Sequence, residues 1–253
     1  MSKILFCFLC LFSALTGRTQ SKIILVGNVH YPSAAYNADS LYVVLELLKP
    51  DIILLELDSA AFTKIMKEGF PSKENEPLAT LRYIDKYPHT LAAPFEFQGR
   101  DVYRKEKGIR QASGKVDELL DSLYKNKLLT KKQHRIVSFY YKLTDSLSTY
   151  TQKSLASFNN TGTDSLSRIR QYYQHAEIRK VINQRKEFRN LFVNTTLGER
   201  VSLQEAYNRL CDFWDFRNKT MAKNILTVAS NNPGKKIVVL TGFFTDITCF
   251  RKL

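Results

Sequence analysis

The sequence predicts an α/β fold with a mostly parallel central sheet, which is split by a long helical insertion and closed by a C-terminal strand. Three short apolar runs predict this fold, at residues 23–26, 52–55 and 237–240. A stretch with helical spacing joins the first two runs, and the third run comes late, after a long and mostly helical region. Continuous apolar strands that alternate with helices are typical of a parallel sheet covered on both faces.

The chain has 253 residues, of which 44% are hydrophobic and 25% charged, as expected of a globular protein. Residues 1–20 form a charged start, an apolar stretch and a polar end, which predicts a secretory signal peptide cleaved near Gln20. An uncleaved anchor is the less favoured alternative. We therefore expect an exported protein, periplasmic or extracellular, with a single domain at residues 21–253. No later segment of the sequence is long and apolar enough to cross a membrane.

The first half of the chain predicts strands and helices in alternation. The strand near residue 25 leads to a helix at 37–48 and a second strand at 52–56, and this short crossover predicts that the two strands are parallel neighbours. Helices are predicted at 59–70 and 76–86. A third strand is predicted at 90–97, where Pro94 favours an edge position.

The helical insertion is predicted at residues from about 101 to 230, where the sequence pattern is mostly helical and polar. A stretch rich in Ser, Thr, Asn and Gly at 157–167 predicts a loop within it, and helices are predicted at 178–192 and 203–228. His134 and His175 lie on polar helices and are expected in solvent. A turn at 232–234 leads to the last strand.

The formal net charge is +14, and removal of the leader with Lys3 and Arg18 leaves +12. Residues 100–200 hold 21 Lys and Arg against 10 Asp and Glu. The favoured interpretation is a solvated helical face, and the alternative is a surface that binds nucleic acid or another anion. Cys211 and Cys249 are the two cysteines outside the leader, and a disulfide and two buried thiols are equally compatible with the sequence.

Chemically useful side chains follow the apolar runs. Gly27-Asn28-Val29-His30 closes the first run, and Glu56 directly follows the second. Ligands and catalytic groups collect at the carboxyl ends of strands in α/β sheets. His30 could act there as general base or metal ligand, and Glu56 could orient it, share a metal or activate water. Asp58 is predicted to cap the next helix.

Two further segments add detail to this pattern. Arg100 follows the third predicted strand, and a helix from Trp214 to Ile225 carries Arg217-Asn218-x-x-Met221. With these residues the chain resembles the TraB/GumN/TIKI family, which is similar in fold to the erythromycin esterase and ChaN-like proteins. The resemblance covers essentially the whole mature chain.

The resemblance implies a site made of paired glycine-x-x-histidine motifs and a glutamate, and some members are credited with metal-dependent hydrolysis. His30 matches the first histidine, Glu56 the glutamate and Arg217 an arginine of the family. Gly242 begins the second motif, but Thr245 stands where its histidine is expected. A threonine hydroxyl neither titrates near neutral pH nor binds a divalent metal strongly. The site is therefore impaired, or the C-terminus is altered, or Asp246 substitutes.

The leading hypothesis is an exported metal-dependent hydrolase, or a form of one weakened by Thr245, that acts on a small-molecule or peptide substrate. Its divalent metal would be Mn, Co or Zn, and its arginines would hold an anionic group or the charge of the transition state. The predicted catalytic residues are His30, Glu56, Arg100 and Arg217, with His30 and Glu56 as metal ligands. The predicted substrate contacts are Gly27, Asn218, Gly242 and Thr245. The alternative is a non-catalytic binding protein on the same fold, and no specific nucleic-acid partner is expected.

Overall fold

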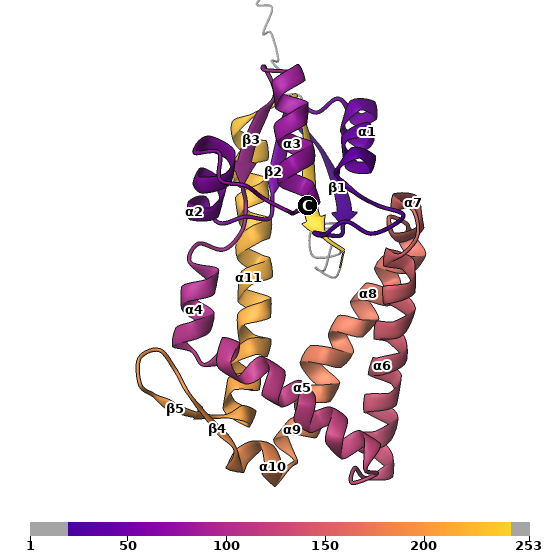
Figure 1. Cartoon of the computed structure of the whole chain (residues 1–253), viewed down its shortest axis with the longest axis vertical. Coiled ribbons are helices and arrows are strands. Elements are labelled where there is room, and N and C mark those ends of the chain that lie inside the picture. The colour runs from indigo at the N-terminus through magenta and orange to yellow at the C-terminus, as the bar shows by residue number, and fades with distance from the viewer. Residues whose placement is uncertain (1–19, 244–253) are drawn as a thin grey trace, which may run out of the picture.

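The structure is a computed structural model that describes residues 20–243. A parallel sheet lies at one end and a helical region at the other (Figure 1). The strands are β1 (Lys22–Asn28), β2 (Ile52–Leu55), β3 (Leu91–Pro94), β4 (Phe192–Asn194), β5 (Arg200–Ser202) and β6 (Lys236–Gly242). The helices of the sheet end are α1 (Ala38–Leu48), α2 (Ser59–Phe62), the π-helix η1 (Thr63–Lys67) and α3 (Asn75–Lys86). The remaining helices are α4 (Arg100–Glu106), α5 (Ile109–Lys125), α6 (Lys131–Thr151), α7 (Leu155–Phe158), α8 (Thr161–Tyr172), the π-helix η2 (Tyr173–Glu177), α9 (Ile178–Asn183), α10 (Lys186–Asn190) and α11 (Leu203–Asn231).

The four-stranded sheet has the order β1-β6-β2-β3, and all its strands are parallel. The predicted α/β class is confirmed, and β3 with Pro94 lies at an edge as expected. The prediction that the first two strands are neighbours is wrong, because β6 lies between them. Six of the seven residues of β6 are buried, whereas the start of β1 is more exposed. The more apolar strand thus takes the interior position although it comes last in the chain.

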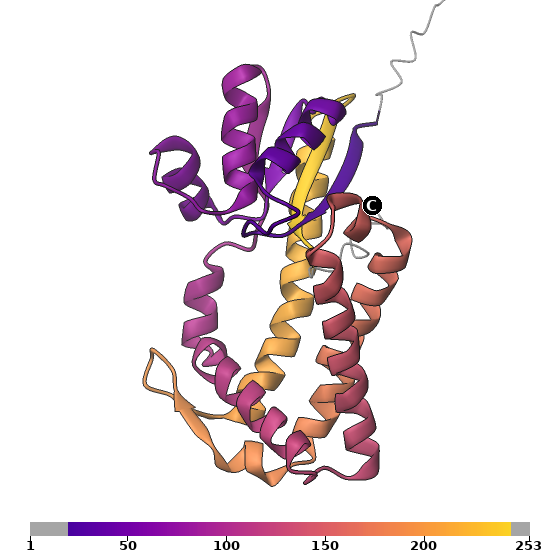
Figure 2. The same ribbon diagram turned by 45° about the vertical axis from the view of Figure 1, so that its right-hand side comes forward.

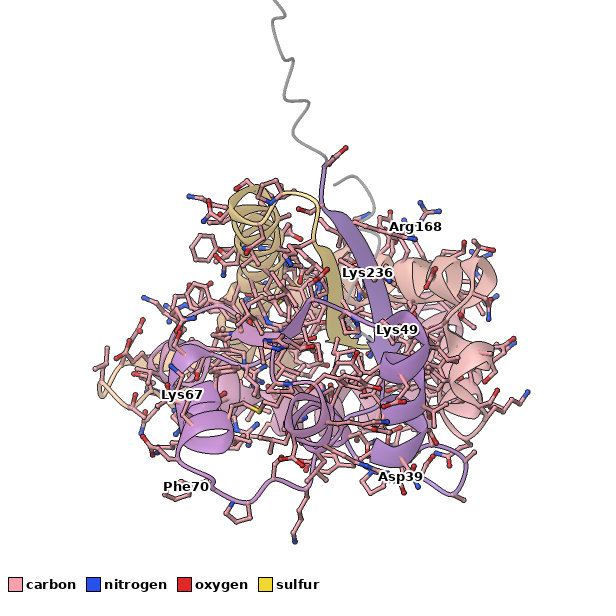
Figure 3. All side chains as sticks on the ribbon, turned by 90° about the horizontal axis from the view of Figure 1, so that it is seen from above. Asp39, Lys49, Lys67, Phe70, Arg168 and Lys236 are labelled. Atoms are coloured by element: carbon pink, nitrogen blue, oxygen red, sulfur yellow. The ribbon has the colours of Figure 1, made fainter. Side chains whose placement is uncertain are left out.

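The sheet is the middle of three layers. Alternate residues of a strand point to opposite faces, so Ile53 and Leu55 of β2 pack with α1 and α3, while Ile52 and Leu54 pack against Ile225 on α11. Seen from above, α1 and α11 lie on opposite sides of β6 (Figure 3). Burial on both faces explains why the sequences of these strands are continuous apolar runs.

A second core fills the helical region. It is formed by apolar side chains of α5, α6, α9, α10, the β4–β5 hairpin and the first half of α11. Helix α11 runs from this core to the sheet (Figure 2). Its residues Leu203, Ala206, Tyr207 and Cys211 belong to the helical core, and Met221 and Ile225 belong to the core under the sheet. Arg217 therefore lies on α11 between the two cores.

The loop predicted at 157–167 is wrong, because α7 and α8 occupy most of this segment. Its polar residues serve as helix caps: the Asn160 side-chain oxygen accepts hydrogen bonds from the N–H groups of Gly162 and Thr163. Phe158 is fully buried and packs against Tyr36 and Phe243. The polar composition therefore marks a break between two short helices.

Several other local predictions can be compared with the structure. Asp58 caps α2 as expected, since its carboxylate accepts from the N–H of Ala61 at 2.8 Å. The β4–β5 hairpin was not predicted. His175 is not in solvent but stacks on Trp214, with ring centres 5.0 Å apart.

Some sequence predictions lie outside the described residues. These are the leader and, at the other end, Thr245, Asp246 and Cys249. Cys211, by contrast, is buried in the helical core. Among residues 20–243, no helix has both the length and the apolar character needed to cross a membrane.

Candidate functional site

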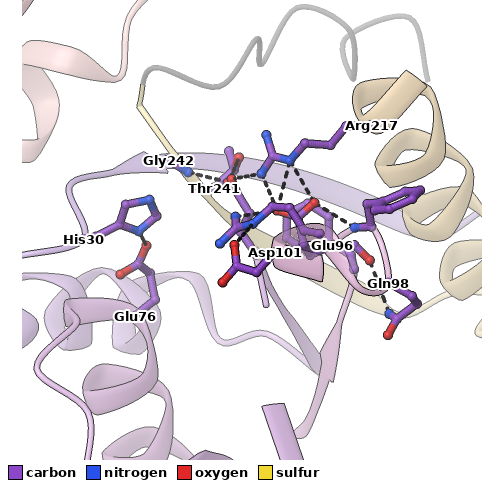
Figure 4. A network of polar contacts seen from close by, with 12 residues as sticks. His30, Glu76, Glu96, Gln98, Asp101, Arg217, Thr241 and Gly242 are labelled. Atoms are coloured by element: carbon purple, nitrogen blue, oxygen red, sulfur yellow. Dashed lines mark hydrogen bonds and ion pairs between the residues drawn. The ribbon is translucent and has the colours of Figure 1, made fainter. Parts of the chain in front are cut away.

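Polar side chains gather at the carboxyl edge of the parallel sheet. His30 follows β1, Glu56 directly follows β2 and Glu96 lies two residues after β3. Asn28 of β1 pairs in register with Gly242, the last residue of β6. The four strand ends therefore bring these residues to one edge, where Figure 4 shows His30, Glu96 and Gly242.

The first cluster on this edge, the Arg217 cluster, consists of Arg217, Glu56, Glu96 and Arg100. Arg217 Nε donates to the two carboxylate oxygens of Glu96 at 2.8 and 3.0 Å. Another nitrogen of Arg217 donates to Glu56 at 2.5 Å, and also to Glu96. Arg100 adds a bond of 2.9 Å to Glu96. Two cations and two carboxylates thus neutralise one another, with Arg217, Glu56 and Glu96 almost completely buried.

Glu56 is held ionised by its surroundings. Its second carboxylate oxygen accepts from the Thr241 hydroxyl at 2.6 Å and from the Gly242 N–H at 2.7 Å. Burial alone would raise the pKa of Glu56, but the charge of Arg217 and these two donors lower it to about 2. A carboxylate with so low a pKa is a weak proton acceptor near neutral pH.

The sequence reasoning did not single out Glu96, although a signal for it is present. Glu96 lies near the end of the strand predicted at 90–97, two residues after β3, much as Glu56 lies at the end of the strand before it. It is 1% exposed and also accepts from the Phe97 N–H at 2.7 Å. The rule that identified Glu56 therefore applies equally to Glu96.

The second cluster, the His30 cluster, consists of His30, Glu74 and Glu76. His30 Nδ1 lies 2.6 Å from a carboxylate oxygen of Glu76, which also accepts from the Asn28 side chain. The start of α3 is fixed to the end of β1, because the Asn75 N–H donates to the His30 carbonyl at 2.7 Å. Glu74 and Glu76 lie at the N-terminus of a helix rather than at a strand end, so the strand-end rule could not find them.

The charged groups of the His30 cluster shift one another's pKa values. The hydrogen bond with Glu76 raises the pKa of His30 to about 9 against the opposing effect of burial, and the charges of Glu76, Glu56 and Glu74 add to the rise. Burial raises the pKa of Glu74. The charges of His30 and Arg100 lower it, and the charge of Glu76 raises it. Glu56 and Arg100 of the first cluster thus act electrostatically on the second, and both clusters form one site.

The donor atoms of the His30 cluster fit a divalent cation. One ligand atom from each of His30, Glu74 and Glu76 lies within 4.8 Å of the others. The Glu76 side chain is 5% exposed, and its oxygen Oε2 has no hydrogen-bond partner among the described residues. A buried carboxylate oxygen without a partner is costly. A cation held by the three side chains would satisfy this oxygen.

Two cavities open on this edge, and Trp214 of α11 lines both. The histidine cavity, of about 260 Å³, is lined by Asn28, Val29, His30, Tyr31, Trp214, Gly242 and Phe243. The arginine cavity, of about 230 Å³, is lined by Glu56, Arg100, Arg104, Leu210, Phe213, Trp214 and Arg217. A ligand that extends past Trp214 could therefore reach both clusters.

The predicted site residues are placed as follows. His30, Glu56, Arg100 and Arg217 all lie at the sheet edge. The carboxylate bonded to His30 is that of Glu76. The group that could hold a cation contains Glu74 and Glu76 beside His30, rather than Glu56.

The predicted substrate contacts have different surroundings. The N–H and the carbonyl of Gly27 are bonded to the Asn159 side chain at 2.7 and 2.8 Å. Asn218 is buried, its oxygen has no partner among residues 20–243, and it lines neither cavity. The N–H of Gly242 is used by Glu56. Thr245 lies outside the described residues.

A third cavity lies in the helical region, away from the sheet edge. It has a volume of about 540 Å³ and is lined by Leu129, His134 and three cations, which are Lys127, Lys131 and Arg135. His134 stacks on Tyr124 there. This cavity lies at the turn between α5 and α6 and shares no residue with the other two.

Comparison with known proteins gives one distant likeness. No protein-family model and no curated protein sequence matches the chain. Among solved structures, the chain is similar to an erythromycin esterase mutant in its open conformation, with 12% sequence identity and a TM-score of 0.31. The match covers 88% of this chain and 60% of the esterase chain, so this chain spans less than two thirds of the esterase's length. Membership of the TraB/GumN/TIKI family stays a prediction.

Proposed function

We propose that the chain is a metal-dependent hydrolase whose site is the carboxyl edge of the sheet. The observation that carries this proposal is the buried Oε2 of Glu76, which lies beside His30 and Glu74 and has no partner within the described range. A folded chain rarely leaves such an oxygen without a partner unless a ligand completes the site. This assignment keeps His30 as a ligand and replaces Glu56 by the two carboxylates of the His30 cluster.

The donor set suggests which cation would bind. One imidazole nitrogen and two carboxylate oxygens are ligands that suit Zn²⁺, Mn²⁺ and Co²⁺. Three protein ligands would leave room for a water molecule or a substrate atom. The bound ion would supply a Lewis acid for the hydrolysis of an ester or amide bond.

The Arg217 cluster would position and polarise the substrate. Glu56 is ionised but weakly basic, so we assign it to holding Arg217 in place rather than to activating water. Arg217 and Arg100 both line the arginine cavity, where their charge would favour an anionic group of the substrate or the negative charge that develops in the transition state. The substrate class proposed is a small molecule or peptide, without specific binding of nucleic acid.

Export belongs to the same proposal. The leader predicted at residues 1–20 would direct the chain to the periplasm or outside the cell, and the domain at 21–253 would act there. Secretion of a tagged chain, compared with a chain that lacks residues 1–20, tests this part separately.

Metal binding is the first test. We expect Mn²⁺, Co²⁺ or Zn²⁺ at about 100 times its Kd to raise the free energy of unfolding of the chelator-treated protein by about 2.7 kcal/mol. Glu76→Gln and His30→Ala should abolish this stabilisation. Glu68→Gln, which removes an exposed carboxylate, should keep it. Equal stabilisation of all four proteins would contradict the proposed site.

Hydrolysis is the second test, and it separates the proposal from its alternative. We expect the metal-loaded protein to cleave members of a panel of esters and peptides, and we expect Glu76→Gln to lose this activity. A protein that binds the metal at the His30 cluster but cleaves nothing would instead be the non-catalytic binding protein. The weak basicity of Glu56 favours that alternative.

A further inference from the structure

Arg104 differs from the other arginines of the site because none of the described residues pairs with it. Arg217 is paired with Glu56 and Glu96, and Arg100 is paired with Glu96 and Asp101. Arg104 is half-buried and lines the same cavity, yet it makes no ion pair or hydrogen bond with any residue in the described range 20–243. A guanidinium that is partly removed from water and unpaired favours the binding of an anion.

The charge balance of the arginine cavity points the same way. Glu56, Glu96 and Asp101 are paired with Arg100 and Arg217, so Arg104 is left without a carboxylate partner among residues 20–243. Burial and the neighbouring charges of Arg100, Arg110 and Arg217 lower the pKa of Arg104, and the charge of Asp101 offsets only part of this effect. An anion placed among these guanidinium groups would relieve their repulsion.

The remaining walls of the cavity are apolar. Leu210, Phe213 and Trp214 of α11 line it beside the arginines. Phe213 is 3% exposed and stacks on Tyr103, so this wall is firmly packed. The cavity thus offers a charged end and an aromatic side within about 230 Å³.

We propose that the arginine cavity binds a substrate carboxylate that has an apolar group next to it, as at the C-terminus of a peptide with an apolar last residue, and that Arg104 receives this carboxylate. The proposal deepens the proposed function, because Trp214 also lines the histidine cavity and the bound substrate would extend from Arg104 toward His30. A carboxylate can accept two parallel hydrogen bonds from one guanidinium. The apolar walls favour an anion that carries an apolar group over inorganic phosphate, which carries none.

Trp214 allows a direct measurement, because it is the only tryptophan of the chain. We would titrate the full protein, in chelator and without added metal, with N-acetylphenylalanine and follow the Trp214 fluorescence. N-acetylphenylalaninamide is the matched neutral probe, and inorganic phosphate is the probe for a dianion. We expect the carboxylate probe to bind at least about tenfold more tightly than either, as one charge-assisted hydrogen bond would give.

Two variants identify the residue. Arg104→Gln should weaken binding of N-acetylphenylalanine about tenfold or more, because it removes the unpaired charge. Lys105→Gln removes an exposed charge from the same helix and should leave binding unchanged. Since Arg104 has no partner in the described chain, its replacement should not disturb the fold, and circular dichroism and the unfolding midpoint would check this.

Several results would overturn the proposal. These are equal binding of the neutral amide, unchanged binding by Arg104→Gln, or tighter binding of phosphate than of the carboxylate probe. The measurement needs neither metal nor hydrolysis, so failure of the proposed hydrolase would appear in the metal and cleavage tests and not here. Carboxylate binding that depends on Arg104 in a protein that takes up no metal would support this subsite and contradict the hydrolase.

Discussion

The Arg217 cluster and the His30 cluster lie at the same sheet edge but differ in how completely their charges are paired. In the Arg217 cluster, two guanidinium groups meet two carboxylates, and backbone and hydroxyl donors complete Glu56. In the His30 cluster, three titratable groups face one another, and a buried oxygen of Glu76 has no partner among residues 20–243.

This difference indicates different tasks. A cluster whose charges are satisfied within the chain fixes α11 against the strand ends and positions the groups around it. A cluster with an unsatisfied buried oxygen is completed by something from outside. The following predictions test this division, beginning with the largest expected effect.

Removal of Arg217 should destabilise the fold severely. Arg217→Met would leave Glu56 and Glu96 buried without their main cation, and we expect a loss of about 3–5 kcal/mol in the free energy of unfolding, measured with urea. Lys219→Met, an exposed charge on the same helix, should cost less than about 1 kcal/mol. Similar values for the two variants would mean that the Arg217 cluster does not hold the fold together.

The ionised Glu56 should make the fold sensitive to acid. Its pKa is about 2 when folded, against 4.5 for the ordinary carboxyl group, so the unfolded chain takes up the proton first as the pH falls. The stabilisation is complete above about pH 5 and is lost as the pH falls toward 2, with a total of about 3 kcal/mol. Urea unfolding across this range should give a flatter pH profile for Glu56→Gln than for the wild type. Glu68→Gln should keep the wild-type slope, and an unchanged profile in Glu56→Gln would contradict the assignment.

His175 extends the comparison to a buried group whose two ring nitrogens have no hydrogen-bond partner in the part of the chain that the structure describes. Burial and the charges of Arg170 and Arg179 lower its pKa from 6.5 to about 3. The unfolded chain therefore binds the proton first, and this one group should cost about 1.5 kcal/mol of stability between pH 6.5 and pH 5.

His175→Phe keeps a ring against Trp214 but cannot titrate, so its stability should change less over the same interval of pH. The exposed His89 gives the control, since His89→Gln should follow the wild type. A wild-type protein whose stability is constant from pH 6.5 to pH 5 would show that His175 is not held neutral by the fold.

Much of the fold could be predicted from local pattern. The three apolar runs and the segment at 90–97 identify the four strands of the parallel sheet. Pro94 indicates an edge, and Asp58 is recognisable as a helix cap. Local pattern could not predict the order of the strands, because β6, from the other end of the chain, lies between β1 and β2. Strands joined by a short connection are often neighbours, but this is only a tendency. Here the burial of the more apolar strand β6 in the interior of the sheet outweighs that tendency.

The candidate site was predicted in part for the same reason. His30 and Glu56 were found because both end apolar strands, and a strand end has a fixed place in a parallel sheet. The partners of these residues come from elements whose position depends on the whole fold. Glu76 reaches His30 from a helix 46 residues later, and Arg217 reaches Glu96 across 121 residues.

The sequence by itself determined the α/β class, the strand ends and the residue types that collect there, because side-chain periodicity and chain punctuation are local properties. The tertiary structure decided which charges meet. In the folded chain Arg217 pairs with Glu56 and Glu96, and His30 pairs with Glu76. Arg104 and one oxygen of Glu76 have no partner in the described chain. Pairing of buried charges depends on distances of a few ångströms between distant segments, and these distances arise only when the sheet and the helices have packed.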